Sequence, residues 1–249
     1  MDRTETLLAR FLTELRAAVA LDALWLHGSL ALGDYQEGAS DIDAVAVLAA
    51  PLSRPQRGAV VALHRGLERE GPLAGRLHCN YVVRDAWDDP ARPHLNWSYN
   101  GLRPKPISLV WRRELLLGEH ALYGPGPRGI VPEVADADLA AYIRADVRDV
   151  LLPAAGKRRL WLRDMWVDYG PLMLARASVT LADGRLITKR AALGVLADLA
   201  APPELVEDIR RRRYEAPAPA GPRWRLRRAR LARAFLREGI PRVLARPSP

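Results

Sequence analysis

Residues 27–43 read HGSLALGDYQEGASDID, and the segments on both sides of this stretch are apolar. Residues 23–26 read ALWL before it, and residues 44–48 read AVAVL after it. Short apolar runs next to glycine-rich turns are typical of buried strands. The stretch therefore predicts one strand, a Gly-Ser turn that feeds a helix, and a second strand.

Asp41 and Asp43 are expected on the second of these strands. Side chains at positions i and i+2 of a strand point to the same face, so the two carboxylates lie together while Ile42 turns into the core. Like charges this close repel each other, and a divalent cation with oxygen ligands is the usual partner that neutralises them. The pair predicts a metal site.

Gly28 and Ser29 stand at the turn that leaves the first strand. Backbone N–H groups and a hydroxyl, with no large side chain in the way, suit a ligand with anionic oxygens. The turn therefore predicts a phosphate-binding element that faces the metal site.

The combination G-S-x(10)-S-D-x-D, followed by an apolar strand, resembles the signature of the DNA polymerase beta-like nucleotidyltransferases. The resemblance implies that Gly28 and Ser29 bind the triphosphate of ATP, the substrate. It also implies that Asp41 and Asp43 hold two Mg²⁺ ions against that triphosphate. The alternative is that this stretch has no catalytic role and forms only an acidic edge strand after a glycine-rich loop.

A departure from the family pattern lies on the strand expected at residues 77–83. Related enzymes carry a third carboxylate on this strand, at the position that His78 occupies here. His78 is a candidate catalytic base, since an unperturbed imidazole pKa of about 6.5 suits proton abstraction near neutral pH. Three alternatives stay open: Asp85 supplies the carboxylate, His78 is a histidine without a role, or activity is lost.

Composition restricts the class of protein. The 249 residues carry a formal net charge of +9 and one cysteine, Cys79, which excludes an internal disulfide and fits the cytoplasm. No apolar run reaches the length of about 20 residues that a membrane helix needs, and the N-terminus lacks a secretion pattern. The arginines cluster late in the chain, where a solvated helix face explains them better than nucleic-acid binding.

The periodicity predicts an α+β fold with two domains. A nucleotidyltransferase domain over residues 1–130 has a small mixed sheet with helices at 4–20 and 54–70, a long polar loop at 84–106, and a strand or short helix at 107–117. A helical-bundle domain follows at 131–249. Its expected helices lie at 139–152, stopped by Pro153, and at 160–181, 189–199, 203–214 and 223–238, with a linker at 215–222.

Residues 111–125, WRRELLLGEHALYGP, resemble the linker segment of the aminoglycoside adenylyltransferases. Arg176 and Lys189 also resemble a pair in the streptomycin and spectinomycin adenylyltransferases. The resemblance implies that these two cations bind the nucleotide phosphates, and that Tyr214 contacts the nucleotide.

An acceptor with amino groups would need an acidic and aromatic wall. Asp164, Trp166 and Asp168 lie at the start of the long helix expected at 160–181, where Asp164 and Asp168 share a face. They are candidates for acceptor binding, although acidic residues also favour helix N-termini without any ligand.

The hypothesis is a Mg-dependent adenylyltransferase. It transfers AMP from ATP to a hydroxyl of a small molecule such as an aminoglycoside or aminocyclitol, as in antibiotic resistance, and is expected to be a cytoplasmic monomer. The alternative is a catalytically degenerate nucleotide-binding or regulatory protein of the same fold. An RNA-directed enzyme ranks last, because such enzymes need more chain for RNA contacts.

Overall fold

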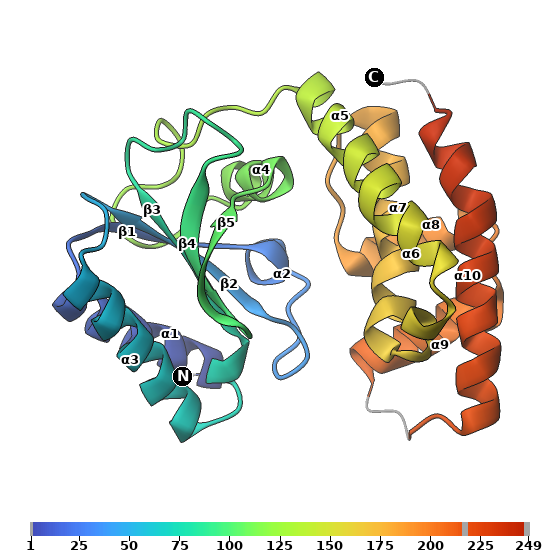
Figure 1. Ribbon diagram of the computed structural model, residues 1–249, viewed down its shortest axis with the longest axis horizontal. Helices are drawn as coiled ribbons and strands as arrows, with labels where there is room; N and C mark the ends of the chain where they lie inside the picture. Colours follow the sequence, from blue (N-terminus) through green and yellow to red (C-terminus); the bar gives the residue numbers. More distant parts are fainter. Residues whose placement is uncertain (1, 216–218, 247–249) are drawn as a thin grey trace. The chain divides into compact units, whose positions relative to one another are not determined.

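A mixed sheet of six strands lies at the centre of the first unit, Met1–Val134, in the computed structural model, which describes residues 2–215 and 219–246 (Figure 1). The strand order is β5-β4-β3-β2-β1-β6, in which β2 and β3 are parallel and the other neighbours are antiparallel. The mixed sheet expected from the sequence is confirmed. The strands are β1 (Leu21–His27), β2 (Ile42–Leu48), β3 (Leu77–Val83), β4 (Pro93–Ser98), β5 (Gly101–Pro106) and β6 (His120–Tyr123).

Helices pack on both faces of this sheet. On one face, α1 (Arg3–Ala18) and α3 (Arg54–Glu70) cover the apolar side chains at even positions of β2. On the other face, α4 (Leu109–Gly118) packs on odd positions such as Val45 and Val47. Because side chains alternate along a strand, Asp43 points to the face that α4 covers.

A β-hairpin occupies much of the segment for which a long polar loop was predicted. β4 and β5 pair in register from Pro93 opposite Pro106 to Ser98 opposite Gly101, so this prediction was wrong. Proline lacks the N–H donor of a ladder and is tolerated on an edge strand, and β5, with Pro104 and Pro106, is the edge of the sheet. The proline-rich composition therefore marks an edge strand here.

Of the strand or short helix predicted at 107–117, the structure has the helix, whereas a second segment differs from the expectation. Residues 107–117 contain the helix α4, which begins after the N-cap Ser108. The segment expected as a linker contains β6, which pairs with β1 at the other edge of the sheet. The chain therefore adds one more strand before the first unit ends.

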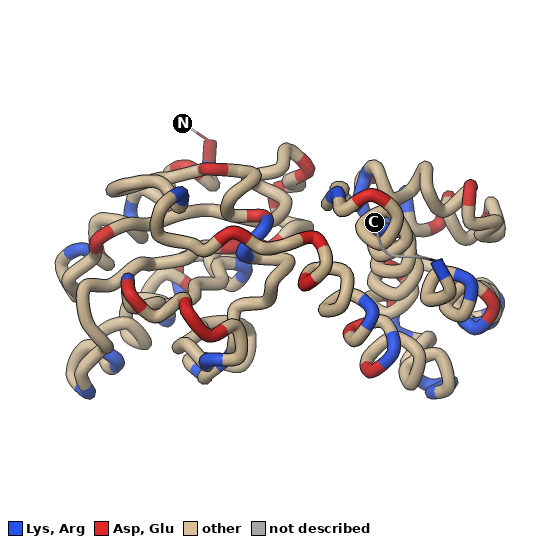
Figure 2. Tube along the Cα trace, turned by 90° about the horizontal axis from the view of Figure 1, so that it is seen from above, with Lys and Arg blue, Asp and Glu red and all other residues tan. Residues whose placement is uncertain are grey.

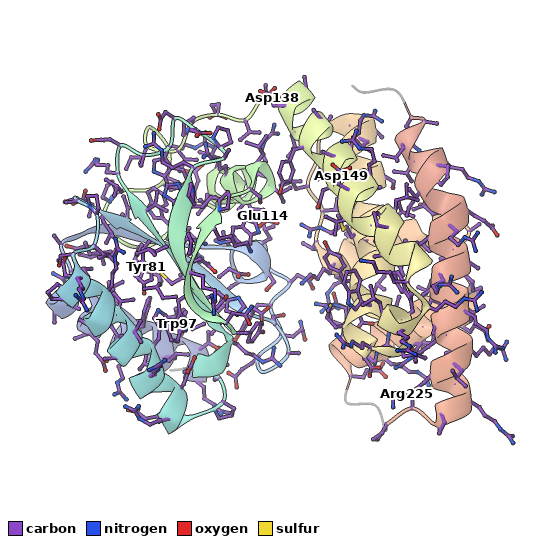
Figure 3. The ribbon with its side chains drawn as sticks, in the orientation of Figure 1. Tyr81, Trp97, Glu114, Asp138, Asp149 and Arg225 are labelled. Atoms are coloured by element: carbon purple, nitrogen blue, oxygen red, sulfur yellow. The ribbon has the colours of Figure 1, made fainter. Side chains whose placement is uncertain are left out.

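His64 on α3 gives the unit a testable pH dependence. Its Nε2 lies 2.6 Å from the hydroxyl of Tyr81, and its ring stacks on Trp97 with centroids 4.6 Å apart; Figure 3 labels both partners. Burial, together with repulsion from His78, lowers the pKa of His64 to about 3. The folded state therefore keeps a neutral imidazole where the unfolded chain takes up a proton, below about pH 6.5.

The free energy of unfolding should consequently fall as pH drops from about 6.5 toward 3, with a slope of up to about 1.4 kcal/mol per pH unit from this group. Urea unfolding across this range measures the slope. We expect a smaller slope in His64→Gln and an unchanged one in His120→Gln, where the histidine is exposed. Equal slopes in the native protein and His64→Gln would contradict the assignment.

The second unit, Ala135–Pro249, is helical among its described residues, which confirms the α+β class with a C-terminal helical region. α7 packs against α10 in its interior, where Gly170 leaves room for the ring of Trp161. The elements are α5 (Asp136–Asp146), the π-helical turn η2 (Val147–Leu151), α6 (Leu152–Gly156), the 3₁₀ turn η3 (Arg158–Leu162), α7 (Asp164–Asp183), α8 (Lys189–Asp198), α9 (Pro203–Tyr214) and α10 (Pro222–Leu244).

Pro153 does not stop the first helix of this unit. A π-helical turn, η2, follows α5, and Pro153 then lies in the first turn of α6, where no N–H donor is needed. Helical structure therefore continues to Gly156, and the prediction of a stop was wrong. The helix predicted at 189–199 is confirmed as α8, and its N-cap is Thr188, whose hydroxyl accepts a hydrogen bond from the N–H of Ala191.

Some expectations fall on residues outside the described part. The predicted linker at 215–222 includes residues 216–218, and the helical domain predicted at 131–249 includes residues 247–249. Within residues 2–215 and 219–246, no helix has the length and apolar character needed to cross a membrane.

Candidate active site

Three polar side chains form a row across neighbouring strands of the first unit. His27 at the end of β1 is opposite Asp43 on β2, and Asp43 is opposite His78 on β3. Because directly paired residues point to the same face, all three lie on the face that α4 covers. Nδ1 of His78 lies 3.7 Å from Oδ1 of Asp43.

Asp41 directly precedes β2 and lies beside the same row. Its Oδ1 lies 3.4 Å from Nη1 of Arg76 and accepts a hydrogen bond from the hydroxyl of Tyr99. Tyr99 stands in the turn of the β4–β5 hairpin, and its ring meets the ring of His78 edge-on, with centroids 4.5 Å apart. Tyr99 thus connects Asp41 with the row that contains Asp43.

The two carboxylates also affect the titration of Tyr99. Burial, the hydrogen bond to Asp41 and the charges of Asp41 and Asp43 together raise the pKa of Tyr99 to about 12. The hydroxyl therefore stays protonated at neutral pH and donates to Asp41. Contacts through Tyr99 and His78 therefore join Asp41 and Asp43 in one cluster, called the carboxylate cluster below.

Gly28 approaches this cluster more closely than another residue could. Its φ is +66°, in the left-handed region that favours glycine, and a Cβ at this position would lie 2.8 Å from Oδ2 of Asp43. Both the backbone conformation and the space therefore require glycine. Ser29 follows it in the short helix α2 (Gly28–Ala31), and its carbonyl accepts a hydrogen bond from the N–H of Asp34.

The register of β3 decides one of the alternatives for the missing carboxylate. His78 is opposite Asp43 at the start of β3, whereas Asp85 follows the other end of that strand. Seven residues of strand span about 20 Å, so Asp85 cannot join the cluster. The alternative in which Asp85 supplies the carboxylate is therefore excluded.

Several residues next to the row of His27, Asp43 and His78 were not predicted as site residues from the sequence. Lys105 on β5 and Trp111 on α4 meet in a cation–π contact, and the ring of Trp111 lies 5.2 Å from the ring of His27. Glu114 on α4, labelled in Figure 3, is buried with Oε2 3.5 Å from Nδ1 of His27. No local signal marks these residues, because the hairpin and α4 bring them to the row from distant parts of the chain.

Arg176 and Lys189 lie on the two sides of the connection between α7 and α8. Nε of Arg176 donates a hydrogen bond to the carbonyl of Ile187 at 2.8 Å, and Lys189 is the first residue of α8. Tyr214 ends α9, and the guanidinium of Arg190 lies 4.1 Å from the centre of its ring. All three residues belong to the second unit, and their contact with a nucleotide stays a prediction.

Asp164 and Asp168 take part in a network of ion pairs within the second unit. Asp168 pairs with Arg212, and Asp164 pairs with Arg228, a guanidinium that is almost fully buried. Asp208 contacts both arginines and so joins the two pairs. The network connects α7, α9 and α10, and removal of one partner would leave an uncompensated charge in it.

Trp166 lies between two other aromatic side chains. Its ring meets those of Trp161 and Tyr169 edge-on, with centroids 6.1 and 5.7 Å apart. Trp166 and the two paired carboxylates therefore have packing partners in the protein, and a role in acceptor binding stays a prediction.

Charged residues occur along the chain in both units (Figure 2). The basic residues late in the chain include arginines of α9 that pair with acidic neighbours: Arg210 and Arg211 both contact Glu207. Such pairs fit a solvated helix surface.

Residues 8–85 match the family model described as a nucleotidyltransferase domain. The chain carries a nucleotidyltransferase domain. The matched segment includes β1, β2 and β3, and with them the residues at the centre of the cluster: Gly28, Ser29, Asp41, Asp43 and His78.

The nucleotidyltransferase domain and the helical unit together are similar to a crystal structure of spectinomycin adenyltransferase AAD(9) from Enterococcus faecialis with ATP and spectinomycin. The TM-score is 0.68 at 14% sequence identity, and the match covers 94% of this chain and 99% of that chain. No curated protein sequence matches the chain. The resemblance to DNA polymerase beta-like nucleotidyltransferases and to the fold of the aminoglycoside adenylyltransferases is thereby confirmed.

Proposed function

We propose that this protein transfers AMP from ATP to a hydroxyl of a small molecule, an aminoglycoside or an aminocyclitol-like acceptor. The observation that carries the proposal is the cluster of Asp41 and Asp43 against Gly28, on one face of a nucleotidyltransferase domain. The fold shared with the spectinomycin adenyltransferase supports the choice of acceptor class.

Asp41 and Asp43 suit Mg²⁺ that is shared with a nucleotide. Mg²⁺ is usually held by one or two carboxylates together with substrate phosphates and water. Across residues 2–215 and 219–246, no group of three or more His, Cys, Asp or Glu side chains is arranged to hold a metal. We assign Asp41 and Asp43 as the protein ligands of two Mg²⁺ ions whose remaining ligands are triphosphate oxygens and water. When bound, the ions neutralise phosphate charge and lower the pKa of the acceptor hydroxyl.

The reaction is an in-line displacement at the α-phosphorus of ATP. A bond forms between the acceptor oxygen and the α-phosphorus, the bond from that phosphorus to the bridging oxygen breaks, and pyrophosphate leaves with the electron pair. We assign His78 as the base that takes the hydroxyl proton, since its Nδ1 lies next to the carboxylate of Asp43. Asp43 then stabilises the imidazolium that forms.

The remaining roles complete the proposal. Gly28 and Ser29 are assigned to bind the phosphates through backbone N–H groups and a hydroxyl, and Arg176, Lys189 and Tyr214 are assigned to bind the nucleotide. Asp164, Trp166 and Asp168 contact the acceptor. An acceptor with amino groups would have to compete with Arg212 and Arg228 for the two carboxylates.

A second candidate function is nucleotide binding without transfer. The observation that favours it is His78 at the position opposite Asp43, where related enzymes carry a carboxylate. A neutral imidazole supplies no negative charge to a metal, so a protein with this site could bind Mg–ATP and use it as a regulatory ligand.

Calorimetry with Mg–ATP, combined with a pyrophosphate-release assay over aminoglycosides and aminocyclitols that include spectinomycin, tests the proposal. We expect binding, pyrophosphate release with at least one acceptor, and an AMP adduct of that acceptor in its mass spectrum. Binding without release for any acceptor would favour the second candidate. A protein that does not bind Mg–ATP would contradict both.

A further inference from the structure

Lys105 brings a positive charge to the site from outside the matched nucleotidyltransferase segment. It lies on the edge strand β5, directly opposite His94 on β4. Its ammonium nitrogen lies 4.4 Å from the centroid of the Trp111 ring on α4. The side chain therefore points to the face that α4 covers, which is also the face of Asp43.

Two contacts connect Lys105 with the carboxylate cluster. The Trp111 ring under its ammonium lies 5.2 Å from the ring of His27, the residue just before Gly28 and opposite Asp43. The negative charge of Asp43 also acts on Lys105 and raises its pKa, although partial burial outweighs this effect and lowers the pKa. Lys105 is therefore within electrostatic reach of Asp43.

The cation–π contact with Trp111 alone would stabilise a lysine at position 105 only weakly. Cation–π contacts near the protein surface are weak, and Lys105 lies at the surface with its ammonium partly covered by the Trp111 ring. An ammonium has three N–H donors, and the face of a ring does not use them all. Donors remain for a ligand that binds beside Asp43.

A triphosphate at Gly28 would need such a cation. It brings several negative charges next to Asp41 and Asp43, and the leaving pyrophosphate carries more charge in the transition state than in the ground state. Hydrogen bonds from an ammonium to phosphate oxygens are charge-assisted and stronger than neutral ones. Lys105 is held by Trp111 near the place where this charge collects.

We propose that Lys105 binds the triphosphate of the nucleotide and donates hydrogen bonds to its non-bridging oxygens on the side of the site next to Asp43. This role rests on the proposed function, because it requires Mg–ATP at the cluster. It assigns a phosphate-binding residue to the β4–β5 hairpin, in addition to the Gly-Ser turn.

The proposed binding of the triphosphate by Lys105 can be tested with the variants Lys105→Gln and Lys105→Arg and with a matched control variant. Arg103 is the control, because it lies two residues earlier on the same strand and face, and its Nε donates to the carbonyl of Asn100 at 3.0 Å. We expect Lys105→Gln to weaken Mg–ATP binding about tenfold to a hundredfold, the usual effect of losing a charged hydrogen bond. Lys105→Arg should keep most of the affinity, and Arg103→Gln all of it.

Calorimetry measures the affinity for Mg–ATP, and competition with Mg–ATP measures the affinity for adenosine. The affinity for adenosine should be the same in the native protein and in Lys105→Gln, because adenosine has no phosphate. Native affinity for Mg–ATP in Lys105→Gln, or an equal loss in Arg103→Gln, would overturn the role of Lys105 and leave the proposed function standing. A native protein that neither binds Mg–ATP nor releases pyrophosphate overturns the proposed function, and the role of Lys105 with it.

Discussion

Asp43→Asn is expected to lower nucleotidyl transfer by about a thousandfold or more while the protein stays folded. The amide has the shape of the carboxylate but lacks its charge, so it holds Mg²⁺ poorly. Charge stabilisation by a bound metal contributes several kcal/mol to a transition state, and about 4 kcal/mol corresponds to this factor. Asp41→Asn should behave in the same way.

The matched control is Asp22→Asn, on the same strand as His27 but at its other end. Asp22 pairs with Arg84, with Oδ2 and Nη1 3.5 Å apart, and lies away from the cluster. Pyrophosphate release and calorimetric affinity for Mg–ATP should fall in Asp43→Asn and stay native in Asp22→Asn, with equal circular dichroism. Native turnover in both Asp41→Asn and Asp43→Asn would rule out the metal assignment.

Local signals were sufficient for the elements that carry the centre of the site. β3 covers Leu77–Val83 and α3 covers Arg54–Glu70, both as expected from the sequence. The helix follows from the capping box of Ser53 and Gln56 and from apolar spacing, and the strand from its apolar alternation. These signals act within a few residues, so they can be recognised without knowledge of the fold.

The β4–β5 hairpin and the continuation of helix past Pro153 depend on interactions that a local pattern does not contain. Pro104 and Pro106 predict a loop from the local pattern alone, whereas in the fold they lie on β5, a strand with one unpaired edge. By itself, Pro153 predicts the end of a helix. In the structure the π-helical turn η2 precedes it, so Pro153 lies in the first turn of α6. In both cases the tertiary context decides whether a missing N–H matters.

The candidate site also contains some residues that local sequence signals identify and others that only the tertiary structure brings together. Gly28, Asp41 and Asp43 lie within sixteen residues and could be recognised by their spacing, and the β2–β3 register adds His78. Tyr99, Lys105 and the residues of α4 reach the row only because the hairpin extends the sheet and α4 packs on its face. A spacing rule could not have found them.

Gly28→Ala is expected to reduce transfer about a hundredfold and to lower the free energy of unfolding by about 1–2 kcal/mol. The stability loss follows from the φ of +66°, which costs a residue with a Cβ about this much. The activity loss has a separate cause, because the new Cβ would lie 2.8 Å from Oδ2 of Asp43 and must displace that carboxylate. A shift of about 1 Å in a reacting group can cost a hundredfold in rate.

Gly33→Ala separates these two effects. Gly33 has a similar φ of +73°, yet a Cβ there would meet no heavy atom within 4 Å in the part of the chain that the structure describes. The two variants should therefore lose similar stability in urea unfolding, while only Gly28→Ala loses transfer and affinity for Mg–ATP. Equal activity in both would mean that Asp43 tolerates the displacement, and that the close approach of Gly28 to its carboxylate has no part in catalysis.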